Sequence, residues 1–153
     1  MPIESGSSVV ASSLAGFEIG YDQITAPVNV ASTTEATGTT IISCAAHTFD
    51  GAPVLLTVYF PYIENGTAAA ADVTVCLFEG ATQLGRLGIF GPASGTLQEV
   101  CAFCAQYRFT PSAASHTYTI TAFANTTTGT PQIGADVTGT GHYMPGFARF
   151  TKV

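Results

Sequence analysis

Four cysteines and three histidines are the residues best suited to metal or redox chemistry. Cys101 and Cys104 form a CxxC pattern, which can bind zinc or act as a redox pair. A closed zinc site needs two more ligands, but Cys44 and Cys76 stand alone and the histidines are far apart in sequence. A redox CxxC usually opens a helix, whereas this one lies in a run with strand periodicity. We therefore expect buried or half-buried small apolar side chains, with disulfides and a metal site as the alternatives.

His47 is the most suggestive candidate for nucleophilic catalysis. It lies three residues before Asp50 and close to Ser43 and Cys44. A catalytic triad is defined by its geometry, and the chain has no GxSxG turn to expose a nucleophile. This segment is typical of a strand that ends in an Asp-Gly turn. His116, on an alternating strand, is expected to be a partly buried polar contact, so we predict no catalytic residue.

The acidic residues give no sign of a reaction either. All ten are scattered singly, with no DxD or ExxE cluster and no calcium loop of spaced Asp and Asn ligands. The glycine-rich residues 134–146 lack the spacing of a phosphate-binding loop. We therefore predict that the chain is not an enzyme and uses no cofactor or metal.

Aromatic residues offer a different kind of site. There are six Tyr and ten Phe but no Trp, and most lie within apolar runs that are typical of a core. Tyr62 and Tyr143 lie beside Pro or Gly loops and are candidates for contact with a partner. Asn65 and His142, in the same expected exposed loops, complete the set of candidate partner-binding residues.

The elements that would position these residues are strands. Apolar residues recur with period two almost throughout, and Gly, Pro and Asn interrupt them every 8 to 15 residues. No segment has a sustained helical period. Strands are expected around Val28 and Val30 and over residues 39–44, 53–60, 72–79, 83–90, 97–109, 115–124, 132–137 and 147–153. The glycines at 85 and 88 leave the register uncertain and indicate either bulges or a close backbone approach.

This pattern predicts an all-β fold. We expect an antiparallel β-sandwich, jelly-roll-like, with about eight to ten strands. Residues 1–15 are Ser- and Ala-rich and lack clear periodicity, which predicts a flexible N-terminal arm. Residues 16–153 are expected to form a single domain, because 153 residues leave little room for a second.

Charge is scarce in this chain. Only 9% of residues are charged, 46% are hydrophobic, and the net charge is −6. Four basic residues cannot replace the counterions of a nucleic acid, so that partner is excluded. No apolar run approaches the 18 to 20 residues of a membrane span. Because isolated domains usually keep more surface charge, we expect a homo-oligomer.

The first residues suggest the compartment. They contain neither a basic n-region nor an apolar h-region, so we expect no secretory signal and synthesis in a reducing cytosol.

Several segments of this sequence look familiar. They are residues 20–25 (GYDQIT), 46–51 (AHTFDG), 77–82 (LFEGAT), 107–112 (YRFTPS), 115–118 (SHTY) and 149–153 (RFTKV). Over roughly residues 16–153 the chain resembles small virion proteins of tailed bacteriophages. The resemblance implies a β-sandwich or jelly-roll module, often trimeric, that decorates capsids or forms part of a tail. It also implies assembly in the host cytoplasm and a final location on the virion surface.

Two functions follow from this resemblance. In the first, the chain is a capsid decoration or cementing protein that binds the major capsid protein or another virion protein, with residues 1–15 as a tether. In the second, it is a tail-associated adhesion module whose loops, residues 62–67 and 126–143, contact a host receptor or glycan. The absence of a stalk or repeat in 153 residues favours the first.

Overall fold

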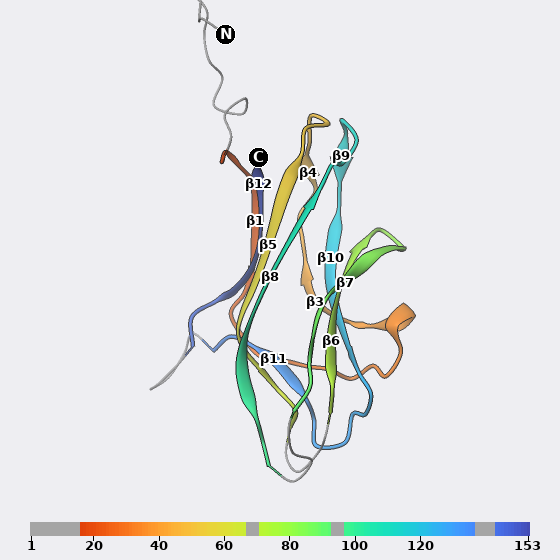
Figure 1. Cartoon of the computed structure of the whole chain (residues 1–153), viewed down its shortest axis with the longest axis vertical. Coiled ribbons are helices and arrows are strands. Elements are labelled where there is room, and N and C mark those ends of the chain that lie inside the picture. Colours follow the sequence, from red (N-terminus) through yellow and green to blue (C-terminus); the bar gives the residue numbers. More distant parts are fainter. Residues whose placement is uncertain (1–15, 67–70, 93–96, 137–142) are drawn as a thin grey trace, which may run out of the picture.

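The protein folds into two antiparallel sheets that face each other (Figure 1). The structure, a computed structural model, describes residues 16–66, 71–92, 97–136 and 143–153. Within them, eight strands have five or more residues: β1 (Glu18–Ile24), β3 (Thr39–Ser43), β5 (Val54–Glu64), β6 (Val73–Glu79), β7 (Thr82–Phe90), β8 (Val100–Phe109), β10 (Tyr118–Ala124) and β12 (Gly146–Lys152). Shorter elements are β2 (Val28–Asn29), β4 (His47–Thr48), β9 (Ser115–His116), β11 (Gln132–Gly134) and the 3₁₀ turn η2 (Glu35–Thr37).

The order of the long strands is that of a jelly roll. The larger sheet runs β1-β12-β5-β8, with β11 and β2 added beside the far end of β5. The smaller sheet runs β3-β10-β6-β7. Lettered B to I in chain order, the eight long strands form sheets B-I-D-G and C-H-E-F, the two four-stranded layers of a jelly roll. The predicted all-β sandwich is therefore confirmed.

Alternation along the strands places the core between the two sheets. On β5, Val54, Leu56, Val58 and Phe60 are completely buried. Val75, Leu77 and Ile120 of the smaller sheet belong to the same apolar cluster. Full burial of one such side chain contributes about 1.5–3 kcal/mol, so the paired inner faces supply the main stabilisation of the fold.

Of the local details, one departs from the sequence expectation and another agrees with it. Strand β1 lies in a segment that the periodicity did not single out, and its register shifts between Glu18 and Gly20. The predicted bulges beside Gly85 and Gly88 are confirmed, because the β6–β7 register shifts at Val75/Cys76 and again at Leu77/Phe78. The expected arm, residues 1–15, lies outside the described residues.

Candidate functional site

Three of the four candidate contact residues, Tyr62, Asn65 and Tyr143, lie at the far end of β5. Tyr62 is only 8% exposed and packs against Tyr143, with 4.8 Å between ring centroids. Burial raises the pKa of Tyr62, and the nearby Glu64 and Asp136 add to the effect. Tyr143 is exposed, as expected, whereas His142 lies outside the described residues. Of Tyr62 and Tyr143, only Tyr143 is exposed enough to contact a partner.

Asn65 has a structural position instead of the expected exposed one. Its side chain is fully buried, where Nδ2 donates to the Leu97 carbonyl oxygen at 3.0 Å and Oδ1 accepts from the Glu99 backbone N–H at 2.7 Å. These bonds join the end of β5 to the segment that leads into β8. The expectation that Tyr62 and Asn65 are exposed is wrong, because a loop assignment from Pro and Gly does not reveal tertiary hydrogen bonds.

The two histidines of the short β4–β9 ribbon connect it to both sheets. His47 and His116 are paired across the ribbon. His47 Nε2 lies 2.7 Å from Asp22 of β1 in the larger sheet. His116 Nδ1 bonds to Glu79 at the end of β6 in the smaller sheet. His116 is thus the partly buried polar contact that the sequence predicts.

Ser112, His116 and Glu79 form a chain of hydrogen bonds that resembles a catalytic triad. His116 Nε2 lies 3.0 Å from the Ser112 hydroxyl but also 3.1 Å from the Ser112 carbonyl oxygen. A serine nucleophile also needs oxyanion donors and a substrate cleft, and Ser112 is not among the residues that line the pocket between β1 and β4 described below. We interpret these hydrogen bonds between Ser112, His116 and Glu79 as stabilising the turn between β8 and β9.

All four cysteines are free, and their exposure differs from the expectation. Cys44 and Cys76 are buried, and burial raises the pKa of each thiol to about 12. Cys101 and Cys104 are exposed, so the prediction of buried or half-buried side chains is wrong for the CxxC pair. The reason is that β8 is an edge strand, hydrogen-bonded only to β5. Over the described part of the chain, no group of three or more His, Cys, Asp or Glu residues could hold a metal ion.

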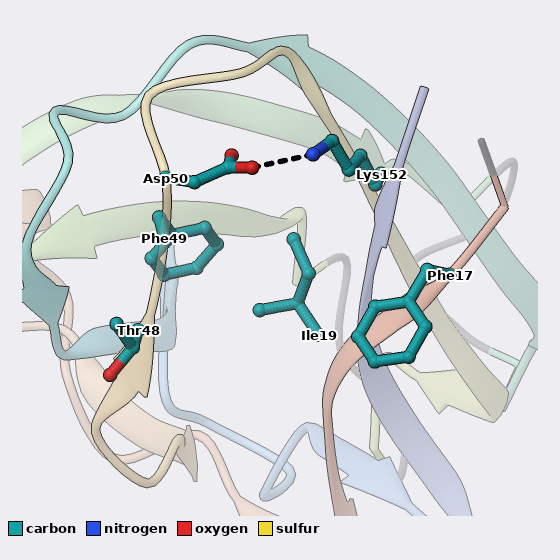
Figure 2. A pocket seen from close by; sticks show the side chains of 6 residues that line it. All are labelled: Phe17, Ile19, Thr48, Phe49, Asp50 and Lys152. Atoms are coloured by element: carbon teal, nitrogen blue, oxygen red, sulfur yellow. Dashed lines mark hydrogen bonds and ion pairs between the residues drawn. The ribbon is translucent and has the colours of Figure 1, made fainter. Parts of the chain in front are cut away.

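A pocket opens at the end of the sandwich where β1 and β4 approach each other. Its volume is about 280 Å³, and Figure 2 shows the side chains that line it: Phe17, Ile19, Thr48, Phe49, Asp50 and Lys152. Phe17, Ile19 and Phe49 form an apolar wall below the Asp50–Lys152 ion pair (Figure 2). The Asp50–Lys152 bond lowers the pKa of Asp50. The ion pair is intramolecular, so this pocket offers a partner little beyond apolar contact.

The outer face of the larger sheet carries a row of aromatic residues, of which Tyr21 is exposed and Tyr59 and Phe147 are half-buried. Tyr21 stacks on Phe147 with 5.4 Å between ring centroids, and Tyr59 lies 5.7 Å from Phe147 on the other side. The Arg149 guanidinium lies over the Phe147 ring, 5.9 Å from its centroid. These residues point outward, since Ala148 and Phe150 between them are fully buried in the core. We call Tyr21, Tyr59, Phe147 and Arg149 the aromatic face.

Two of the four basic residues lie on this side of the larger sheet. Arg149 belongs to the aromatic face, and Arg108 of β8 pairs with Leu55, whose side chain also points outward. Arg86 and Lys152 are bound in ion pairs with Glu35 and Asp50. Among the described residues, neither Arg108 nor Arg149 is in an ion pair. The sequence did not indicate this face, because its members come from three strands that are distant in the chain.

Comparison with known proteins adds no family. No family model matches the chain, and no curated protein is similar to it. Within the described residues there is no helix long and apolar enough to cross a membrane.

Proposed function

We propose that the chain is a non-enzymatic structural protein of a bacteriophage virion. In this proposal it binds the outer capsid surface as a homo-oligomer, with a trimer favoured, and stabilises the shell as a decoration or cementing protein. The observation that carries the proposal is the aromatic face. It combines one exposed and two half-buried aromatic residues with an arginine, and these are side chains enriched at protein–protein interfaces. The jelly-roll strand order is compatible with a capsid role, since viral capsid domains use this architecture among others.

The distribution of charge supports contact between copies of the chain. Two aromatic faces brought together by a two-fold axis would place unpaired arginines against each other. A different surface offers better complementarity: Leu97 and Val100 are exposed before and at the start of β8, and Glu64 pairs with Val100 across β5 and β8. Repeated contact between two different surfaces builds a closed ring when the rotations from copy to copy add up to a full turn. A two-fold dimer would instead pair each surface with itself, so we favour a trimer over a dimer.

The location of the chain in the particle tests this proposal. Purified particles of the phage that encodes the chain are labelled with an antibody against it and imaged by electron microscopy. Label over the heads, with saturable binding of the protein to undecorated capsids, is the expected result. Label confined to the tails would overturn capsid decoration in favour of the adhesion function. Absence from purified particles would overturn both virion functions.

A further inference from the structure

The segment between β2 and β3 crosses the outer face of the smaller sheet. We call residues 31–38, which include η2, the strap. Gly38 at its end lies against β10, because a Cβ at this position would be 3.0 Å from the Thr121 hydroxyl oxygen. Glu35 accepts hydrogen bonds from Arg86 of β7 through both carboxylate oxygens, at 2.6 and 2.7 Å. Since β6 lies between β10 and β7 in the sheet, the strap spans β6.

Cys76 of β6 is buried on the side of the sheet that the strap covers. Its neighbours Val75 and Leu77 belong to the core cluster, so the Cys76 side chain points to the outer face. It is nevertheless completely buried. Its Sγ donates to Glu35 Oε1 at 3.5 Å, and Gln83 Nε2 lies 4.0 Å from the same sulfur. The strap and its contacts on β7 therefore exclude water from this thiol.

The strap is not part of the hydrophobic core. None of the residues of η2 is buried, and residues 31–38 contribute no side chain to the core cluster. Hydrogen bonds among Ser32, Thr34 and Thr37 instead hold the strap together within itself. Segments with few buried apolar contacts open at a lower free-energy cost than the core strands do. The strap is therefore a unit that can separate from the sheet without loss of the core.

We propose that the strap opens as a unit while the sandwich stays folded, and that the Glu35–Arg86 ion pair is the latch that keeps it closed. Opening moves Glu35 away from the Cys76 thiol and admits solvent to it. Closure places the same thiol under the strap again. The strap thus controls the access of reagents to Cys76. This inference goes beyond the proposed capsid role and does not depend on it.

Alkylation of the purified full chain with iodoacetamide tests the opening. Mass spectrometry of the digested protein gives a rate for each cysteine, at several urea concentrations below the unfolding transition. Exposed Cys104 supplies the rate of an accessible thiol. We expect Cys76 to react more slowly, at a rate that changes little with urea, because opening of the strap exposes little surface. A Cys76 rate that rises with urea as steeply as global unfolding does would overturn the proposal.

Two substitutions test the latch. Glu35→Gln keeps the shape of the side chain but removes its charge, and Arg86→Gln removes the cation. Each is expected to raise the Cys76 rate about fivefold at low urea, the upper end of the usual effect of an exposed ion pair. Asp50→Asn, which breaks the ion pair with Lys152, is the matched control and should leave the Cys76 rate unchanged. Unchanged rates in folded Glu35→Gln and Arg86→Gln proteins, or an equal rise in Asp50→Asn, would contradict the latch.

Discussion

At the scale of single residues, Glu35 shows how the chain uses its few charges. The bidentate bond from Arg86, followed by the bond from Gln83, lowers the pKa of Glu35 to about 2. Arg86 also lies over the Phe123 ring, 5.6 Å from its centroid. One acid and one base therefore fix the η2 loop to β7 in a protein with only four basic residues.

The first prediction concerns the pH dependence of this pair. The folded-state pKa of Glu35 lies below that of an unfolded chain, about 4.3, so the ionised carboxylate stabilises the fold fully above that value. The contribution is lost as the pH falls through about 2. We expect wild type to exceed Glu35→Gln in free energy of unfolding at pH about 7, and the gap to narrow between about 4 and 2. Urea unfolding of both proteins at several pH values measures this difference in free energy. A difference that stays constant with pH would contradict the ion pair.

Thr121 gives a second prediction at this scale. Thr121→Val removes a buried hydroxyl that has no partner and keeps the side-chain shape. We expect the free energy of unfolding to rise by about 1 kcal/mol, the lower end of the cost of an unsatisfied group. Thermal and urea unfolding of the variant and the wild type measure the change. A loss of 1 kcal/mol or more would mean that the hydroxyl is hydrogen-bonded in solution.

At the scale of elements, the end of β5 depends on close packing against β11. The Tyr62 ring lies directly on Gly134, so that a Cβ at this position would overlap ring atoms. Gly134 pairs with Tyr62 across the two strands. In β7, by contrast, a Cβ on Gly85 would meet no atom within 4 Å.

These two glycines provide a matched pair of substitutions. Gly134→Ala forces Tyr62 to move and should cost about 1–3 kcal/mol, as overpacking does. Gly85→Ala should cost nothing and can gain up to about 1 kcal/mol, because alanine restricts the unfolded chain. Chemical unfolding of both variants measures the difference. Equal effects at the two positions would contradict the packing of Tyr62 on β11.

Most of the long strands could be predicted from the local pattern of apolar residues in the sequence. The candidate sites could not, because they depend on contacts between residues that are distant in the sequence. Continuous apolar residues at 53–60 predicted β5, and strict alternation at 115–124 predicted β10. Strand β1 was not predicted, because Gly20 and Asp22 interrupt its apolar pattern. Both residues contact His47: its ring packs on Gly20, and its Nε2 lies within hydrogen-bond distance of the Asp22 carboxylate. The hydrogen bonds of Asn65 and the aromatic face were equally hidden, since each joins residues that are distant in the sequence. Periodicity reports which face of a strand is buried, but not which strands become neighbours.

At the scale of the whole molecule, the aromatic face is the surface for which we infer a covering partner. In a chain with 9% charged residues, Arg149 lies over the Phe147 ring of this row and has no ion pair among the described residues. Burial of that row in a contact between copies would explain how so neutral a chain stays dispersed. The proposed self-association would link the low charge of the chain, its fold and the proposed role in a shell.

A substitution on this face tests which surface is used. Tyr21 is 45% exposed, so Tyr21→Lys should leave the fold intact, yet it adds a charge at the inferred interface. We expect the variant to dissociate to single chains, with its circular dichroism unchanged. Ser43→Lys, at an exposed position of β3 on the edge of the smaller sheet opposite β7, is the control and should keep the wild-type mass. If both variants keep that mass, the interface lies elsewhere.

The mass of the wild-type protein in solution is the most direct test of the central claim. Multi-angle light scattering or sedimentation velocity at micromolar concentration distinguishes one chain of 15.7 kDa from an assembly. Our account predicts a homogeneous species of about three chains, in keeping with a closed cyclic assembly. A single-chain mass of 15.7 kDa throughout this concentration range would contradict it.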